Sequence, residues 1–222
     1  LNQIESLKIL QSEIMNDNDC KIIVDVNPKL KSVIAKMDSY KKIKEFFLIA
    51  RGLANNKVNF DGNKYKALKS TNVRKYFIEG ELKNIDTDFA DVFNQEMIIL
   101  PRTVAYLQAM LKEKEIICLD RIYYLIPNSE CNLNFILGIL NSKLTNTWFE
   151  YYYNTTKVSG NYFDLNGNQI GSIPIPTATK EQQKEIITLV DKILAAKKAD
   201  SSTDTTEWEK QIDQKVYELY GL

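Results

Sequence analysis

Apolar residues recur along this chain with two different periods, and these periods predict where helices and strands lie. Helical spacing predicts a helix over residues 1–15, a short strand follows at residues 21–26, and a helical turn or two covers residues 30–37. This first part of the chain carries no candidate site chemistry. We expect residues 1–39 to connect the remainder to something upstream.

Residues 40–178 are predicted to be mainly strands. Short apolar runs end at prolines or turns, and a proline cannot donate to a sheet because it lacks an N–H. The run at residues 65–69 alternates apolar and basic positions, so Lys64, Lys66 and Lys69 should reach solvent. Further strands are expected at residues 97–100, 104–111, 116–119, 122–126 and 162–165, with a buried strand or helical turn at 43–49.

One longer helix is predicted within this strand region, over residues 135–153. The aromatic residues at its end, 148–153, could stack on bases, but packing in the core is the more common role of such a cluster. Asn-Gly-Asn at 166–168 indicates a turn. Ile-Pro-Ile-Pro at 173–176 then excludes a central strand and ends this unit.

Two helices are predicted to close the chain. Thr179 and Gln182 form a capping-box pattern at the start of the first, and a polar loop at residues 200–206 separates it from the second. Two amphipathic helices joined in this way favour an antiparallel pair. The sequence thus predicts an α+β protein: a connector (1–39), a unit with a curved, mostly antiparallel sheet (40–178) and a helical pair (179–222).

Composition excludes several classes of chemistry. The chain has no histidine, which removes Ser-His and Cys-His nucleophile pairs, imidazole bases and most zinc sites. Three cysteines lie far apart without a CxxC pair, as expected for reduced thiols of a cytoplasmic protein. No apolar run approaches the roughly 18 residues that span a bilayer. Because the chain begins at Leu1 without a signal pattern, we expect a fragment of a longer protein.

Charge is concentrated in one stretch although the net charge is zero. Residues 41–83 hold eleven Lys or Arg against four Asp or Glu, whereas residues 84–100 hold four acidic residues and no basic one. An anionic partner such as nucleic acid would select a basic stretch inside a neutral protein. A solvated face is the alternative reading, and charge alone does not decide between them.

No catalytic constellation stands out in the sequence. Glycine-rich phosphate loops are absent, as is the Asn/Asp-Pro-Pro-Tyr/Phe tetrapeptide of amino-methyltransferases. Asp120 with Lys112 or Lys114 could serve a metal-dependent nuclease. Its place before Arg121 at a strand start indicates instead a structural ion pair or a turn cap. We therefore expect no catalytic residue and no metal ligand in this chain.

Basic and small polar side chains are the stronger candidates for a site. Arg51 and Arg102 each follow a short apolar strand, so each guanidinium should point outward, where it can pair with guanine or clamp a phosphate. Hydroxyl and amide groups suit phosphates and base edges. The candidate DNA-contacting residues are Arg51, Lys57, Lys64, Lys66, Lys69, Ser70, Asn72, Arg74, Lys75, Arg102, Lys157, Ser159 and Asn161.

An ordered set of segments resembles the TaqI-like C-terminal specificity domain, the target recognition domain of adenine-N6 DNA methyltransferases and of fused type II restriction-modification enzymes. No single motif is specific, but their order is, and the resemblance covers about residues 40–222. Type I specificity subunits share the same layout. The segments are 43–53, 68–76, 98–102, 120–127, 137–144, 160–176, 189–194 and 212–222.

The resemblance implies that double-stranded DNA is the partner and that residues 40–178 recognise its sequence. It also implies an upstream methyltransferase domain in the same chain, which would bind S-adenosylmethionine and methylate a flipped adenine at N6. This chain itself should hold no cofactor and should neither methylate nor cut. Two alternatives stay open: an assembly module of a multi-subunit restriction-modification complex, and an autonomous nuclease.

Roles within the candidate site follow from side-chain chemistry. Lysines place a point charge near phosphate, whereas arginine can pair bidentately with a base edge. A third group lies on a polar loop and would form a second contact. We expect Lys57, Lys64, Lys66, Lys69 and Lys75 on phosphates, Arg51, Arg74 and Arg102 on bases, and Lys157, Ser159 and Asn161 in that loop.

Overall fold

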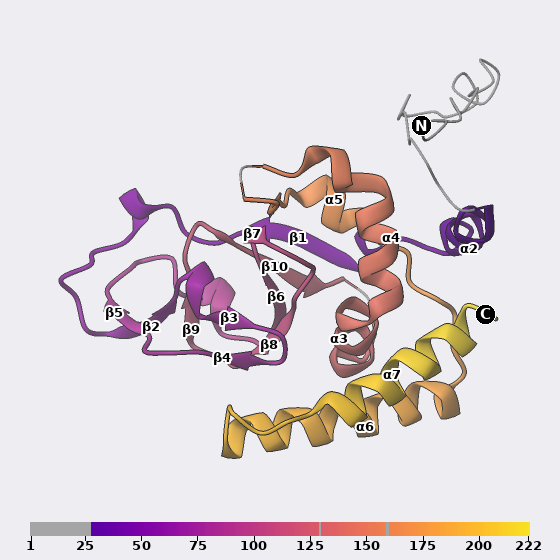
Figure 1. The fold of residues 1–222 in the computed structure, drawn as a ribbon. Helices are drawn as coiled ribbons and strands as arrows, with labels where there is room; N and C mark the ends of the chain where they lie inside the picture. The colour runs from indigo at the N-terminus through magenta and orange to yellow at the C-terminus, as the bar shows by residue number, and fades with distance from the viewer. Residues whose placement is uncertain (1–27, 129, 159) are drawn as a thin grey trace.

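The computed structural model describes residues 28–128, 130–158 and 160–222 of the chain. The helix expected at residues 1–15, the strand expected at 21–26 and Ser159 lie outside these residues. In Figure 1 the strands lie together on the left and centre, helices α3 and α4 lie to their right, α5 lies above β1, and α6 and α7 run beneath. None of the helices in the described part is both long enough and apolar enough to cross a bilayer.

The elements alternate between short strands, single helical turns and longer helices. The helices are α2 (Pro28–Asp38), α3 (Leu133–Asn141), α4 (Lys143–Tyr153), α5 (Gly167–Gly171), α6 (Lys180–Ala199) and α7 (Thr206–Leu219). The strands are β1 (Phe47–Arg51), β2 (Tyr65–Leu68), β3 (Val73–Arg74), β4 (Phe77–Ile78), β5 (Lys83–Ile85), β6 (Met97–Pro101), β7 (Thr103–Val104), β8 (Met110–Lys112), β9 (Ile116–Cys118), β10 (Ile122–Pro127) and β11 (Phe163–Asp164). Short 3-10 turns are η1 (Ile43–Glu45), η2 (Asn55–Lys57), η3 (Ser70–Asn72), η4 (Asp91–Phe93) and η5 (Asn154–Thr156).

The described strands form four sheets. The largest has the order β1-β10-β6-β8 and is antiparallel throughout. A second sheet, β5-β2-β9, contains a parallel pair, β2 with β9. Two small pairs, β3-β4 and β11-β7, complete the set. The α+β class and the mostly antiparallel pairing are confirmed, although the strands are divided among four sheets rather than joined in one.

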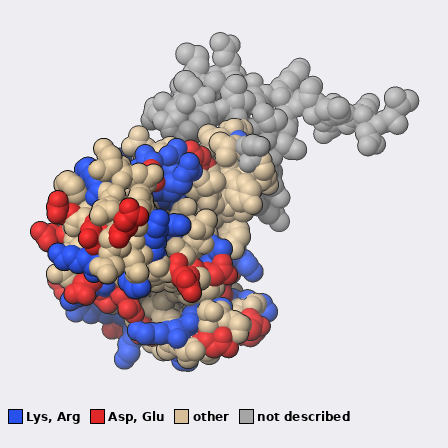
Figure 2. All heavy atoms as spheres, turned by 90° about the vertical axis from the view of Figure 1, so that its left-hand side faces the viewer, with Lys and Arg blue, Asp and Glu red and all other residues tan. Residues whose placement is uncertain are grey.

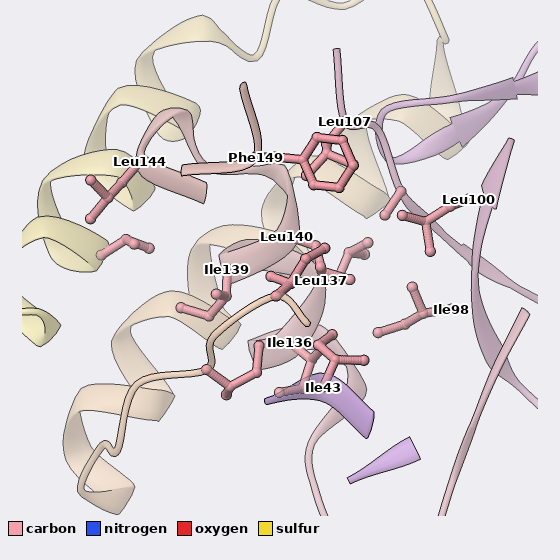
Figure 3. Close-up of a cluster of buried hydrophobic side chains, with 14 of the residues drawn as sticks. Ile43, Ile98, Leu100, Leu107, Ile136, Leu137, Ile139, Leu140, Leu144 and Phe149 are labelled. Atoms are coloured by element: carbon pink, nitrogen blue, oxygen red, sulfur yellow. The ribbon is translucent and has the colours of Figure 1, made fainter. Parts of the chain in front are cut away.

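Strand β6 is buried on both faces, which explains its unbroken apolar sequence. Met97 and Ile99 pack toward the β5-β2-β9 sheet, whereas Ile98 and Leu100 belong to the core shared with the helices. Figure 3 shows Ile98 and Leu100 pointing toward side chains of α3 such as Leu137. The largest sheet is therefore the middle layer of the molecule, between a second sheet and a set of helices.

The helix predicted over residues 135–153 is in fact two helices, α3 and α4. Ser142 between them has an extended backbone, with φ −71° and ψ 153°, and its side chain caps α4 by accepting from the Thr145 N–H at 3.2 Å. The buried Asn141 side chain bonds both the N–H and the carbonyl of Ala109, at 2.8 and 2.9 Å. These polar contacts hold the break that the apolar periodicity did not predict.

The strand predicted over residues 104–111 is also wrong in its middle part. Only its ends are extended, in β7 and β8. Between them the N–H of Leu107 donates to Asn146 Oδ1 at 2.7 Å, and Ala109 is bonded by Asn141. Side-chain amides from α3 and α4 thus replace the neighbouring strand that these backbone groups would otherwise need.

Asn166-Gly167-Asn168 does not form the expected turn but begins α5. Asn166 is the N-cap, and its side chain accepts from the N–H groups of Asn168 and Gln169 at 3.0 Å each. Asparagine is favoured both in turns and at N-caps, so the residue types alone could not separate the two. Ile173-Pro-Ile-Pro176 lies outside the central strands as predicted, since Pro174 forms only an isolated bridge with Lys42.

The closing helices α6 and α7 confirm the predicted pair. Thr179 and Gln182 form the capping box at the start of α6. Ile186, Val190 and Ile193 of α6 and Val216 of α7 are buried in the same core as α3. The division of the chain at residue 178 stays a prediction, and this shared core shows that the pair is packed onto the rest of the protein.

Replacing Thr179 by alanine is expected to lower the free energy of unfolding by about 1 kcal/mol, because the helix loses a cap acceptor. In the native chain Thr179 Oγ1 accepts from the Gln182 N–H at 3.3 Å. Urea denaturation followed by circular dichroism measures the change. Thr188→Ala, in the middle of the same helix, is the matched control and should cost far less. Equal losses for the two variants would contradict the capping role.

Candidate nucleic-acid interface

Three arginines meet at one end of the largest sheet. Arg51 ends β1, Arg102 directly follows β6, and Arg121 directly precedes β10, the strand between those two. Because β10 runs antiparallel to both neighbours, these three positions lie at the same end of the sheet. The Arg102 N–H donates to the Arg121 carbonyl at 2.8 Å and joins the strand ends. We call these arginines, with Asp120 and Asp164, the arginine end.

Arg102 is held by a carboxylate from a distant strand. Its Nε and Nη2 donate to Oδ1 and Oδ2 of Asp164 at 2.8 and 2.7 Å. The pairing of β11 with β7 places Asp164 opposite Thr103 and so beside the guanidinium. The hydrogen bonds from Arg102 lower the pKa of Asp164, and those to Asp164 raise the pKa of Arg102.

Arg51 is held in a similar way by Asp120. Its Nε donates to the Asp120 carbonyl at 2.5 Å and its Nη2 to Oδ2 at 3.1 Å, while 45% of its side chain stays exposed. The structural ion pair expected for Asp120 is confirmed, with Arg51 as its partner. Within the described residues, no group of three or more His, Cys, Asp or Glu side chains is placed to hold a metal ion.

The pKa of Asp164 gives a direct test of this pairing. Arg102→Met should raise the pH at which Asp164 titrates, because the hydrogen bonds from Arg102 are the first cause of its lowered pKa. A carboxylate with a lowered pKa stabilises the fold at higher pH and loses this effect as pH falls through its native pKa. Carboxyl-detected NMR measures the titration. Arg121→Met is the control: Arg121 acts on Asp164 only through a weaker charge effect, so this variant should shift the Asp164 titration less. An unchanged Asp164 titration midpoint in Arg102→Met would exclude the Arg102–Asp164 pair.

Three lysines line an open groove beside β2 and β9. Lys64 and Lys66 lie at the start of β2, and Lys114 lies just before β9. The parallel register sets Lys66 opposite Ile116, so all three lysines share one end of this sheet. We call them the lysine groove. Asp91 and Glu115 line it too, and Figure 2 shows basic and acidic side chains alternating over this face of the molecule.

Two further predicted phosphate contacts lie nearby on the surface. Lys69 is exposed just after β2, and Ser70 follows it in η3. The exposed Lys57 places its ammonium 4.8 Å from the centre of the Phe89 ring. An exposed aromatic ring beside a lysine suits a surface that contacts anionic, partly aromatic ligands.

Three predicted residues in η3 and the β3-β4 hairpin that follows it already have partners within the protein. Asn72 is only 8% exposed and donates to the carbonyls of Glu79 and Glu81 at 2.8 and 3.2 Å. Arg74 pairs with Glu79 through Nη2. Its Nη1 donates to the carbonyls of residues 71 and 73 at 3.1 and 3.0 Å. The Lys75 ammonium donates to the Glu209 carboxylate of α7 at 2.5 Å. Their DNA contacts stay a prediction, while these bonds show that each residue fixes the hairpin.

Lys157 is also engaged within the fold. Its ammonium pairs with Glu150 at 2.8 Å and lies 4.7 Å from the centre of the Phe163 ring, and only 11% of its side chain is exposed. This lysine anchors the end of α4 to β11. Its predicted DNA contact would require these bonds to be exchanged.

Asn161 occupies the tip of the predicted contact loop. It is exposed and has a φ of 63°, a left-handed conformation that asparagine tolerates. The loop leads into β11, whose Phe163 lies opposite Val104 of β7. Within the described residues, no hydrogen bond or ion pair joins Asn161 to the arginine end.

Sequence reasoning missed Asp164, Arg121 and Lys114. Arg121 and Lys114 are exposed basic residues outside the 41–83 stretch, so a search of positions bordering apolar strands would have found both. Asp164 gave no such signal, because it reaches Arg102 across 62 residues of sequence.

The sequence matches the TaqI-like C-terminal specificity domain over residues 57–175, which is more than half of the chain. The chain is thus an α+β specificity domain. It belongs to the family of TaqI-like C-terminal specificity domains. Among curated proteins, none matches this sequence.

Similar solved structures share the fold at low sequence identity. The type IIG restriction endonuclease BpuSI matches with a TM-score of 0.55 and 12% identity, over 87% of this chain and 33% of its own. The type IIL restriction-modification enzyme MmeI, in complex with DNA, matches with a TM-score of 0.56 and 13% identity. This match covers 82% of this chain and 33% of MmeI. The S subunit of a type I restriction-modification system from M. genitalium gives a TM-score of 0.44 and 16% identity. This match covers 71% of this chain and 38% of the S subunit. This chain thus spans about a third of BpuSI and MmeI.

Proposed function

We propose that this chain is the DNA target recognition domain of a restriction-modification enzyme. The observation that carries the proposal is the arginine end. Three arginines lie at one end of the largest sheet, in a chain of the specificity-domain family. Phosphate contacts position a protein on DNA and base contacts specify the sequence. In this proposal the arginine end contacts bases and the lysine groove, with Lys57 and Lys69, contacts phosphates.

The recognition domain would present DNA to a methyltransferase domain upstream in the same protein. That domain would bind S-adenosylmethionine and methylate, at N6, an adenine flipped out of the duplex, at a cost of a few kcal/mol offset by contacts to the DNA. This chain's part is to bind and orient. Lys36 of α2 donates to the Gly221 carbonyl at 2.7 Å, which supports a fixed orientation of the incoming chain.

An assembly module of a multi-subunit complex is the alternative. It would need a free surface on the closing helices. The apolar stripes of α6 and α7 are buried in the core, and within the described residues the large exposed apolar side chains come from other segments, apart from Leu222 at the end of the chain. DNA recognition therefore has the stronger support. A stable dimer through residues 180–220 in size-exclusion chromatography would favour assembly instead.

Salt dependence tests the proposed phosphate contacts. With about six phosphates neutralised, affinity for duplex DNA should fall about 10³-fold between roughly 50 and 200 mM salt. Fluorescence anisotropy with a labelled duplex measures the slope, and Lys66→Ala should reduce it by about one unit. Lys198→Ala, an exposed lysine on α6, is the matched control and should leave it unchanged. Binding without a salt slope would remove the phosphate assignment.

A further inference from the structure

The two outward arginines Arg51 and Arg102 are clamped by the same edge of the guanidinium group. The Asp164 carboxylate accepts from both Nε and Nη2 of Arg102. Nε of Arg51 donates to the backbone carbonyl of Asp120, and Nη2 of Arg51 donates to the Asp120 carboxylate. Neither Nη1 has an acceptor among the described residues. In both residues the end-on edge, formed by Nη1 and the outer hydrogen of Nη2, is left for a ligand.

Arg74 and Arg121 show that this arrangement is particular to two residues. Arg74 donates through Nη1 to two carbonyls of its own hairpin and pairs with Glu79 through Nη2, so its end-on edge is occupied. Arg121 is exposed, and no described residue forms an ion pair with it. The Arg121 guanidinium can turn to meet a phosphate, because no described residue fixes its plane.

Guanine fits the free edge of a clamped arginine. Its major-groove edge presents two acceptors, N7 and O6, which accept bidentately from arginine, whereas adenine offers an acceptor beside an amino donor. Acceptors on the opposite edge hold the guanidinium plane: the Asp164 carboxylate for Arg102, and the backbone carbonyl and carboxylate of Asp120 for Arg51. Less side-chain freedom is therefore lost on binding. The carboxylate also cancels the arginine's charge, which weakens attraction to phosphate and leaves the hydrogen-bond donors available for an uncharged base.

We infer that Asp164 and Asp120 are positioning residues, which hold Arg102 and Arg51 so that each reads one guanine in the recognised DNA sequence. This inference rests on the proposed function. Strands β1 and β6 flank β10, and Arg51 and Arg102 align with positions two residues apart on it. The two arginines therefore start about 12 Å apart. With base pairs 3.4 Å apart, the two guanines should lie within about four base pairs of each other.

Asp164→Asn tests the inference, because it keeps the shape of the side chain and removes the charge and one acceptor. Duplexes are first selected from a randomised pool with the wild-type chain. The variant should lose about 5- to 100-fold of its preference for guanine at one selected position. Its affinity for unrelated duplexes should stay the same or rise, because a negative charge is removed. A merely structural loss would lower both affinities together.

Asp120→Asn should act in the same direction at a second guanine but with a smaller loss, because the backbone carbonyl that accepts from Arg51 Nε remains. Glu79→Gln is the matched control. Glu79 pairs with Arg74, whose end-on edge is occupied, so its replacement should leave every base preference unchanged. If Asp164→Asn alters a position that is not guanine, or alters none while the wild type selects a sequence, the inference is overturned and the proposed function stands. If the wild type selects nothing, the proposed function itself fails.

A modified base tests the same contact without changing the protein. Replacing the assigned guanine by 7-deazaguanine removes the N7 acceptor. The affinity of the wild-type chain should then fall. Adding Asp164→Asn should lower the affinity for the modified duplex only a little further, because the two changes disturb the same contact. Full additivity of the two losses would overturn the assignment.

Discussion

Arg102→Ala is expected to lower affinity for the cognate duplex about 10- to 100-fold and to relax the preference at one base position. The guanidinium lies at the arginine end with its plane fixed by Asp164, and 29% of the side chain is exposed. A truncated side chain removes both donors that we assign to a base edge. Competition binding with duplexes that differ at single positions measures the effect.

Lys66→Ala is the comparison that gives this result its meaning. Lys66 is exposed on β2 and has no ion-pair partner among the described residues. Its loss should weaken binding to all duplexes alike and leave base preferences intact, as expected for a phosphate contact. If Arg102→Ala and Lys66→Ala change binding in the same way, the division between base and phosphate contacts is wrong.

Gly52→Ala is expected to lower the free energy of unfolding by about 3 kcal/mol or more and to abolish DNA binding. A Cβ at this position would lie 2.3 Å from the Leu119 carbonyl oxygen and 2.5 Å from that of Cys118. These are backbone atoms, so the clash is relieved only by moving the chain. Since Gly52 follows Arg51 and Leu119 precedes Asp120, the shift would separate this clamped pair.

Gly167→Ala is the matched control for this substitution. Gly167 begins α5, and a Cβ there would meet only Ile49, at an ordinary distance of 3.9 Å. Alanine is favoured over glycine in a helix by up to about 1 kcal/mol, so stability should be unchanged or slightly higher. Urea denaturation compares the two variants. A Gly52→Ala protein as stable as Gly167→Ala would contradict the close approach of Gly52 to the backbone of Cys118 and Leu119.

Features set by neighbouring residues could be predicted from the sequence. The apolar run at residues 97–100 predicted a strand, and β6 lies there, with side chains that pack alternately into two cores. Thr179 and Gln182 marked the start of α6, and the spacing from Ile212 to Leu219 marked α7. In each case the signal lies within one turn or one strand.

Features set by distant contacts could not be predicted. The break at Ser142 depends on Asn141 reaching the backbone of Ala109, just before β8, and the clamp on Arg102 depends on Asp164 reaching across from β11. The basic stretch at residues 41–83 illustrates the same limit. The excess of basic residues there is clear in the sequence, but the fold pairs four of them, Lys42, Arg51, Arg74 and Lys75, with carboxylates.

Selection of duplexes from a randomised pool by the wild-type chain measures whether this protein recognises a particular DNA sequence. The pool is bound at moderate salt, where phosphate contacts alone are weak, and the retained duplexes are sequenced. We predict that a single short sequence is enriched. A pool that stays random after repeated rounds, while circular dichroism shows the protein to be folded, would contradict the account.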